Sequence, residues 1–379
     1  MSKRQASGSR GRRLSRRNLL RATGALAGFS ATNFLIPREL LAQDKLTGEL
    51  VVTTWGGSFA DAVRTTVVEP FQKEYGVRVT MGVTGNQAEM LTKLRASTMG
   101  GTPDIDLCFN DLSFSYSAIK QGLVEPLRVE NIPNLKTVLP IFNKLERAVP
   151  WDPGPEIHGA PGQYVARGIT YNTKLIKRDI NSVADLWNSE FKGKLGIYSI
   201  TQWMMLNAGF YTSQDMNNFK DLDAIWKALA EQRKIVGRYY SNLAEGQELF
   251  VNETISISPF NGGRTVALKR RGMDVRFVLP KEGFHLNADL LLISKGTHNR
   301  LAAEKFIDFF YRPDIATAAS LGFGFAVGTR NVQPTSEIKE TIPDYDPTGE
   351  FKGATLADPV YWDTNVGRWN DKVKEIMSS

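Results

Sequence analysis

Short apolar runs typical of buried strands alternate along this chain with segments whose apolar residues recur at helical spacing. In the first third, the expected strands cover residues 49–55, 77–81 and 104–109. Each is followed by an expected helix, at 58–69, 86–99 and 114–121. Gly76 is a stop signal beyond the first helix, and Asn86 can cap the second. This βαβαβ order predicts an α/β fold with a parallel sheet covered by helices.

The same alternation returns later in the chain. Further strands are expected at 194–198, 254–258, 273–279 and 290–293. Apolar residues at i, i+3, i+4 and i+7 predict helices at 222–229 and 303–310, and a third helix is expected at 264–271. The stretch 149–163 is rich in proline and glycine and reads as irregular. We expect the chain to pass from one lobe to another there.

The first 42 residues differ from the rest in charge and hydropathy. They hold nine basic residues and one acidic residue, a net charge of +8, whereas the whole chain carries +7. The remainder is therefore almost neutral. A basic stretch up to Arg21, an uncharged apolar stretch at 22–36 and a small residue at Ala42 are typical of an export signal. The apolar stretch is shorter than the roughly 20 residues that span a bilayer.

Residues 15–21 resemble the twin-arginine export signal. The alternative is a basic arm that binds nucleic acid. Such an arm would need neither the apolar stretch nor Ala42, so the export signal is the better interpretation. We expect a chain that is soluble in the periplasm and has no nucleic-acid partner.

Residues that carry catalytic or metal chemistry are sparse. Cys108 is the single cysteine, and its apolar surroundings in the sequence predict a packed, inert thiol. The three histidines lack the spacing of a metal site, and the motifs of nucleophilic and phosphate-binding enzymes are missing. The glycines at 322, 324 and 328 loosely resemble a dinucleotide loop, but a tight turn is the better interpretation. We expect no metal and no cofactor.

Polar loops follow three of the expected strands, at the position where open α/β sheets bind ligands. The loops carry Trp55, Gly57 and Ser58, then Asp111 and Ser113, and finally Asn261 and Arg264. Glycines and a helix start let a ligand approach the backbone, and an arginine suits a carboxylate. The alternative is structural: Trp55 would plug the sheet edge, and Arg264 would be a surface residue at a helix start.

Taken together, several segments resemble the periplasmic solute-binding proteins of ABC importers, in the spermidine/putrescine-binding group. These segments are 50–58, 68–76, 101–106, 122–127, 182–187, 191–196 and 306–314. The resemblance covers nearly all of the chain after the signal. It implies the type II periplasmic-binding-protein fold, with two α/β lobes and the ligand cleft between them. It also implies no enzymatic activity, a monomer, and an ABC permease in the inner membrane as partner.

The resemblance divides the chain into parts. We expect a signal peptide at 1–42, a first lobe at 43–163 and again at 259–320, a second lobe at 164–258, and a C-terminal segment at 321–379 that packs mainly on the second lobe. In the polyamine binders, first-lobe ligand positions match Trp55, Ser58, Asp111 and Ser113. Acidic side chains of those proteins grip the cationic amines.

The ligand is where this sequence departs from the resemblance. One acidic pair is expected after the strand that matches 195–198, but this chain has Gln202 and Trp203 there and no carboxylate. Arg264 follows a later strand, and Arg167 falls near the hinge. Like charges repel in a partly dry cleft, so these arginines disfavour a diamine.

We therefore hypothesise a small solute with a carboxylate held by Arg264 and Arg167. Trp55 or Trp203 would stack on it, and the amine of a γ-amino acid would bind Asp111. Two further readings stay open.

The first is polyamine import, in which Asp111, Asp289 and Glu245 supply the acidic groups. The second is a different class of protein, either a secreted enzyme or a sensor linked to a chemoreceptor. Bound cofactor or turnover would mark the enzyme, and neighbouring permease and ATPase genes would mark the transporter.

Overall fold

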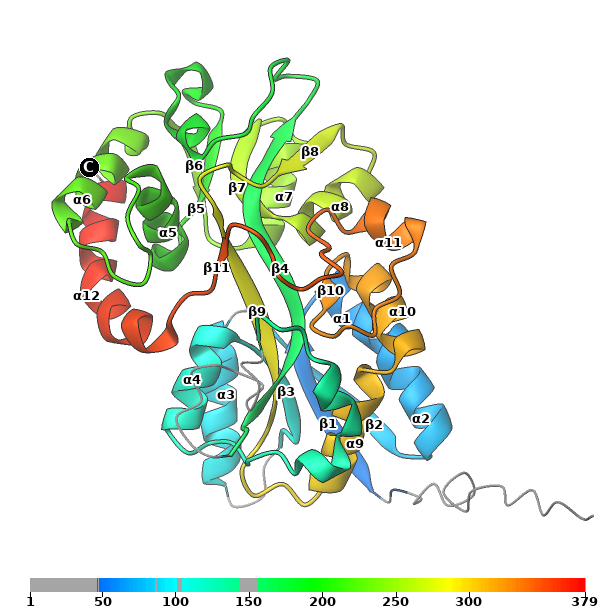
Figure 1. Ribbon diagram of the computed structural model, residues 1–379. Coiled ribbons are helices and arrows are strands. Elements are labelled where there is room, and N and C mark those ends of the chain that lie inside the picture. Colours follow the sequence, from blue (N-terminus) through cyan, green and yellow to red (C-terminus); the bar gives the residue numbers. More distant parts are fainter. Residues whose placement is uncertain (1–45, 47, 86, 101–103, 143–155, 379) are drawn as a thin grey trace, which may run out of the picture. The chain divides into compact units, whose positions relative to one another are not determined.

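The computed structural model describes residues 46, 48–85, 87–100, 104–142 and 156–378 (Figure 1). Residues Lys45–Ser379 form one compact unit. The predicted signal at 1–42 and the predicted cap at Asn86 lie outside the described residues. Within the described ranges, no helix is both long and apolar enough to cross a membrane.

One 11-stranded sheet runs through the unit, with its main path in the order β2-β1-β3-β9-β4-β7-β5-β6. The strands are β1 (Glu49–Trp55), β2 (Arg78–Thr84), β3 (Leu107–Asp111), β4 (Gly159–Asn172), β5 (Leu195–Tyr198), β6 (Val236–Tyr240), β7 (Ile257–Asn261), β8 (Val275–Val278), β9 (Phe284–Ile293), β10 (Ala326–Val327) and β11 (Ala354–Thr355). β8 and β10 pair with β4, and β11 pairs with β9.

Helices flank the sheet on either side (Figure 1) and alternate with many of the strands along the chain. The α-helices are α1 (Ser58–Val63), α2 (Glu69–Tyr75), α3 (Gln87–Met99), α4 (Leu112–Lys120), α5 (Thr201–Tyr211), α6 (Leu222–Arg233), α7 (Leu243–Val251), α8 (Gly262–Arg270), α9 (Arg300–Phe310), α10 (Pro313–Phe323), α11 (Ser336–Thr341) and α12 (Pro359–Ser378). A π-helical turn, η2 (Arg64–Val68), joins α1 to α2, and the 3-10 helices are η3 (Val129–Asn131), η4 (Pro133–Thr137), η5 (Val183–Trp187) and η6 (Ser189–Phe191).

The predicted βαβαβ unit is confirmed. β1 pairs in parallel with β2 and with β3. Helical structure continues from Ser58 to Tyr75 and ends at Gly76, whose φ of 72° is the left-handed conformation that glycine adopts readily. Cys108 is fully buried in β3, and burial raises the pKa of its thiol to about 12. The thiol is therefore protonated and packed, as expected.

The prediction of irregular structure up to Gln163 is wrong for its last residues, because β4 begins at Gly159. Two residues that usually weaken strands, Pro161 and Gly162, are tolerated at a bulge where the pairing register with β9 shifts between Pro161 and Tyr164. β4 is 14 residues long. It links the β9 side of the sheet to the β7 side.

Two hydrophobic cores divide the unit. The first includes Leu50, Phe109, Leu291, Phe306 and Phe351. The second includes Ile169, Leu195, Met205, Trp362 and Trp369. We call the elements around the first core (β1–β3, β9, β10, α1–α4 and α9–α11) the first half. The elements around the second core (β5–β8, α5–α8 and α12) are the second half.

Core membership shows which half each later part of the chain packs in. Phe260 and Leu268 pack in an aromatic cluster with Tyr240 of β6, so the chain is still in the second half beyond residue 259. It returns to the first core from Phe284 onward, along β9. The C-terminal segment 321–379 is shared: its residues up to 351 pack in the first core, and those from 357 pack in the second.

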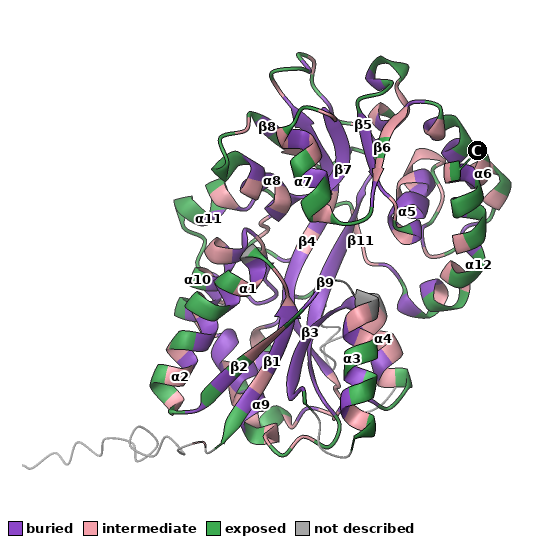
Figure 2. Ribbon diagram, turned by 180° about the vertical axis from the view of Figure 1, so that it is seen from behind, coloured by how far each residue is buried: buried purple, intermediate pink, exposed green. Residues whose placement is uncertain are grey.

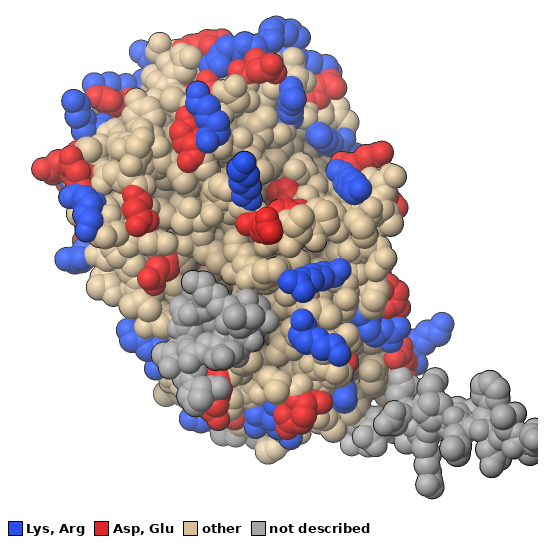
Figure 3. Space-filling model, viewed as in Figure 1, with Lys and Arg blue, Asp and Glu red and all other residues tan. Residues whose placement is uncertain are grey.

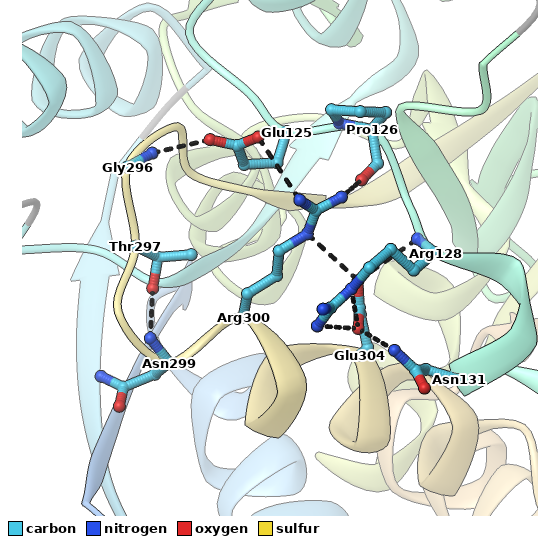
Figure 4. A network of polar contacts seen from close by, with 9 residues as sticks. All are labelled: Glu125, Pro126, Arg128, Asn131, Gly296, Thr297, Asn299, Arg300 and Glu304. Carbon is cyan, nitrogen blue, oxygen red and sulfur yellow. Dashed lines mark hydrogen bonds and ion pairs between the residues drawn. The ribbon is translucent and has the colours of Figure 1, made fainter.

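A polar network joins α9 to the segments on either side of it (Figure 4). Glu304 is fully buried and accepts hydrogen bonds from Arg128 Nε (2.9 Å), Asn131 Nδ2 (2.6 Å) and Arg300 Nε (3.2 Å). Burial raises the pKa of Glu304, but hydrogen bonds from Arg128 and Asn131 and the charge of Arg128 outweigh it and hold the pKa below its usual value. Arg300 also lies 3.8 Å from Glu125, so the network fixes the loop before β4 to α9.

Candidate functional site

Arg167 occupies the residue of β4 at which the strand changes partners. It is opposite His285 of β9 on one side and opposite Asn261 of β7 on the other. β9 continues into the first core, and β7 belongs to the second half. Arg167 therefore lies where the chain crosses between the halves, close to the hinge position expected from the sequence.

The guanidinium of Arg167 is buried but incompletely paired. Its Nη2 lies 3.7 Å from Asp111 Oδ2, and its centre lies 4.3 Å from the centroid of the Trp203 ring. Its Nε and Nη1 have no hydrogen-bond partner among the described residues. Burial lowers the pKa of Arg167 to about 10, against the attraction of Asp111, so the group stays cationic at neutral pH.

A small cavity adjoins this arginine. It lies between α5 and the strands β4 and β9, and its lining includes Arg167, Trp203, Asn207 and His285. His285 is buried, and its Nδ1 has no partner. Burial and the charge of Arg167 both hold the pKa of His285 well below its usual value, so this imidazole is neutral.

Two carboxylates face each other across β3 and β9 on the first-half side of the site. Asp111 is the register partner of Asp289. Asp289 Oδ2 accepts hydrogen bonds from Trp55 Nε1 and Gln163 Nε2. Burial and the charge of Asp111 raise the pKa of Asp289 to about 7, although both donors and Arg167 oppose this.

Arg264 comes from the second half, in the first turn of α8. Asn261 caps this helix by accepting a hydrogen bond from the Arg264 backbone N–H at 3.0 Å. The Arg264 Nη1 donates to Gln247 Oε1 at 3.3 Å. Burial lowers the pKa of Arg264, and the nearby Tyr198 phenol opposes that shift. Arg264 is thus a largely buried cation with one weak neutral partner.

Several other predicted site residues lie at helix starts or cap helices. Gly57 is exposed, has a φ of 71° and precedes α1, which begins with Ser58. Ser113 lies in the first turn of α4, and Gln202 in that of α5. Glu245, an acid of the polyamine alternative, is exposed and accepts the Ser241 backbone N–H at 2.8 Å.

Sequence reasoning missed three polar side chains of this cluster. Gln163 lies in the stretch predicted to be irregular, so nothing in the sequence indicated its hydrogen bond to Asp289. Tyr198 ends β5 and packs against Trp203 with ring centroids 5.1 Å apart. His285 lies two residues into β9, before the part of that strand that the sequence predicted. Gln163 and His285 reach the site through the crossing strands β4 and β9, and Tyr198 reaches it through its packing on Trp203, none of which local patterns reveal.

Neither the surface charge nor the metal-binding side chains of the described residues indicate a second functional site. Figure 3 shows basic and acidic side chains interspersed over one face of the molecule. Among the described residues, no three His, Cys, Asp or Glu side chains are grouped as metal ligands. Gly324 has a φ of 71° and ends α10, so the glycine motif around it forms a tight turn, as expected.

The comparison with protein families decides the identity of the fold. The family described as "Bacterial extracellular solute-binding protein" matches residues 66–343. The chain belongs to this family. The predicted resemblance to the solute-binding proteins of ABC importers and the predicted fold class are therefore confirmed, and the chain is a small-solute-binding component of this kind.

Named relatives agree with this assignment. The spermidine/putrescine-binding periplasmic protein 1 of Haemophilus influenzae is 26% identical over 309 residues, covering 79% of this chain and 81% of the relative. The gamma-aminobutyric acid-binding protein of Pseudomonas aeruginosa is 23% identical over 334 residues, covering 83% and 86%. Both relatives are named as binding proteins for small amine-containing solutes.

A solved structure extends the agreement to the fold. The spermidine/putrescine ABC transporter substrate-binding protein PotD of Streptococcus pneumoniae has a TM-score of 0.72 at 18% identity, covering 87% of this chain and all of that one. Relatives of this kind are periplasmic, which supports a location outside the cytoplasm.

Proposed function

We propose that this protein is the periplasmic receptor of an ABC importer for a small zwitterion that carries a carboxylate and an amine, such as a γ-amino acid. The observation that carries this proposal is Arg167, a buried guanidinium with two nitrogens that lack partners. Leaving a buried donor unsatisfied costs about 1–3 kcal/mol, and more for a charged group. A ligand carboxylate would remove that cost.

Arg264 is the second candidate to bind the ligand carboxylate. It projects from the other half of the unit, and its partner Gln247 is neutral. Arginine binds carboxylates through paired N–H donors, which gives strong and directional contacts. A carboxylate between Arg167 and Arg264 would therefore draw the crossing strand and α8 together, and this difference in affinity between open and closed states is what drives closure.

The amine end belongs with Asp111 and Asp289. Two carboxylates and two arginines make the cluster neutral when all four are ionised. A zwitterion preserves that balance, whereas a diamine would add two positive charges beside Arg167 and Arg264. Burial strengthens this discrimination, because Coulomb interactions are larger in a low dielectric.

Polyamine binding remains the second candidate. The Haemophilus relative is named for spermidine and putrescine, and Asp111 and Asp289 are acids that could hold one amine. The Pseudomonas relative is named for gamma-aminobutyric acid, so relatives alone do not decide between the two ligand classes. The arginines favour the zwitterion.

The deciding experiment is titration calorimetry on the chain from Gln43, unfolded and refolded to remove carried-over ligand. γ-Aminobutyrate, putrescine and spermidine would each be titrated. We expect heat from γ-aminobutyrate, and a loss of about 100-fold or more in its affinity for Arg264→Ala. Arg271→Ala is the matched control, because Arg271 lies just beyond α8 and pairs with Glu248 on the surface at 2.6 Å.

Two results would overturn the proposal. One is unchanged affinity of Arg264→Ala for the γ-amino acid. The other is binding of putrescine or spermidine in place of γ-aminobutyrate, which would establish the polyamine candidate.

Export by the twin-arginine route and delivery to an inner-membrane permease complete the proposal. The motif at residues 15–21 carries the route. The double variant Arg16→Lys/Arg17→Lys should keep the chain in the cytoplasm, where fractionation and blotting would detect the uncut precursor. Export of the variant at the normal level would rule the route out.

A further inference from the structure

The two glycines that open α8 lie in tight contact with the first half. A Cβ atom placed on Gly263 would stand 2.1 Å from a ring carbon of Phe325, and one on Gly262 would stand 3.0 Å from Asp344 Oδ1. Phe325 packs against the first core, whereas Leu268 of α8 lies in the aromatic cluster of the second half. This contact therefore joins the halves at a point outside the crossing strands.

The contact extends along α8. A Cβ on Gly324 would lie 3.4 Å from Val266, and Arg270 Nη2 donates to the Leu321 carbonyl at 2.8 Å. Figures 1 and 2 show α8 beside α10 and α11 in both views. One face of α8 thus covers the end of α10 and the turn that follows it.

Neither glycine at the start of α8 is needed for its backbone conformation. The positive φ angles of the described residues do not include Gly262 or Gly263. Alanine is also favoured over glycine within a helix by about 1 kcal/mol. What these glycines provide is room, and the room is filled by side chains of the other half.

Asp344 completes the contact from the first half. Its Oδ2 accepts the Ala166 backbone N–H of β4 at 2.5 Å, and its buried Oδ1 has no hydrogen-bond partner within the part of the chain that the structure describes. Asp344 thus lies between the crossing strand, one residue before Arg167, and the start of α8. Movement of α8 away from Phe325 would expose this carboxylate to water.

We propose that Gly262 and Gly263 form a closing seat, a surface that receives Phe325 and Asp344 only when the two halves approach each other. This inference rests on the proposed function in that closure accompanies solute binding. The seat contributes to affinity without touching the solute, because any penalty on the closed state lowers the apparent affinity. A methyl group on Gly263 adds that penalty.

The test follows the distance between the halves by pulsed electron paramagnetic resonance. Nitroxides would be attached through Lys73→Cys on α2 and Lys269→Cys on α8, both exposed; the native Cys108 is fully buried. Distances would be recorded without ligand and with γ-aminobutyrate. Gly263→Ala is the variant, and Gly367→Ala is the matched control, because a Cβ on Gly367 in α12 meets nothing within 4 Å.

We expect Gly263→Ala to reduce the short-distance population in both conditions and to weaken γ-aminobutyrate binding about tenfold or more. Gly367→Ala should match the parent protein. The double variant Gly263→Ala/Phe325→Ala should recover most of the loss, because truncating the ring removes the clash. This recovery separates a closing seat from simple damage to α8.

Unchanged distances in Gly263→Ala, or a loss that truncation of Phe325 does not relieve, would overturn the seat. So would the absence of a short-distance population in the parent protein under both conditions. If γ-aminobutyrate fails to bind the parent protein, the proposed ligand is wrong, and the ligand-free distances of the variants still decide for or against the seat.

Discussion

Trp55 and Asp289 lie 234 positions apart in the sequence and are joined by a hydrogen bond from the indole Nε1 to the carboxylate Oδ2. The bond connects the end of β1 to the middle of β9. It orients the aromatic ring that the sequence assigns to the ligand, and it stabilises a carboxylate that burial would otherwise protonate. The protonation of Asp289 therefore depends on the indole of Trp55.

The first prediction concerns pH. The folded-state pKa of Asp289 is about 7, above the ordinary value of 3.8. Between these values the folded chain holds a proton that the unfolded chain releases, so the free energy of unfolding falls as pH rises from about 4 to about 7. The free energy of unfolding, measured with urea, should fall between pH 5 and pH 7.5 in the parent protein. In Asp289→Asn this fall should be smaller by roughly 2 kcal/mol.

The comparison between the two proteins isolates Asp289. Asp344 has its pKa raised to about 6 by burial and acts in the same direction, but it is present in both proteins. Parallel pH profiles for parent and variant would contradict the assignment. A ligand ammonium beside Asp289 should also expel its proton, which calorimetry in buffers of different ionisation enthalpy would detect.

The second prediction concerns the donor. Trp55→Phe keeps an aromatic ring but removes the indole N–H, so the pKa of Asp289 should rise further. Infrared difference spectra across the titration would locate the protonated carboxyl and its midpoint. Stability at neutral pH should fall by about 1–2 kcal/mol, in the range of a lost hydrogen bond to a charged group. A midpoint at or below the parent value would count against the bond.

The third prediction concerns the crossing strand. Arg167→Met removes the charge and keeps much of the packing on Trp203. We expect γ-aminobutyrate affinity to fall by at least 100-fold, about 2.7 kcal/mol. Stability should fall as well, because the substitution removes a cationic partner of the buried Asp111 carboxylate, so affinity is measured on the folded variant below its melting transition. Arg276→Met, at an exposed position of β8, is the control. Retained binding in Arg167→Met would remove this residue from the site.

The fourth prediction separates stability from binding. Glu304→Gln should lower the free energy of unfolding by about 1–3 kcal/mol, because it replaces the charged acceptor of the partly exposed Arg128 and Arg300 with a neutral amide. The pKa of Glu304 is lowered in the folded chain. The contribution of Glu304 to the free energy of unfolding is therefore fully present above its pKa in the unfolded chain. It is lost as the pH falls through its lower pKa in the folded chain. Ligand affinity, measured below the melting transition, should match the parent. A binding defect would mean that the network acts on the site.

The sequence predicted the local elements of this fold well and its long-range connections poorly. The apolar run at 49–55 predicted β1, and Gly76 predicted the end of the helical region that follows. Both signals are local in the sequence. β4 was missed at its start because Pro161 and Gly162 normally interrupt strands, and only the pairing with β9 accommodates them as a bulge. No pattern within the segment carries that information.

The candidate site shows the same limit. Arg167 and Arg264 became candidates because this chain has arginines where the polyamine binders that it resembles do not. That comparison requires no knowledge of which residues are in contact. Trp203 was expected to stack on a ligand, but it already packs against Arg167 and Tyr198 and is nearly buried. Gln163 entered the site only through a hydrogen bond to a residue 126 positions away. Contacts made across crossing strands are therefore the part that sequence alone does not give.

The sharing of the C-terminal segment between the two cores bears on how the protein unfolds. The first core contains both Leu50 and Phe351, and the second contains both Ile169 and Ile376. Because one continuous segment packs in both cores, loss of its packing would weaken both halves at once. We therefore expect the halves to unfold together in one cooperative transition and not one after the other.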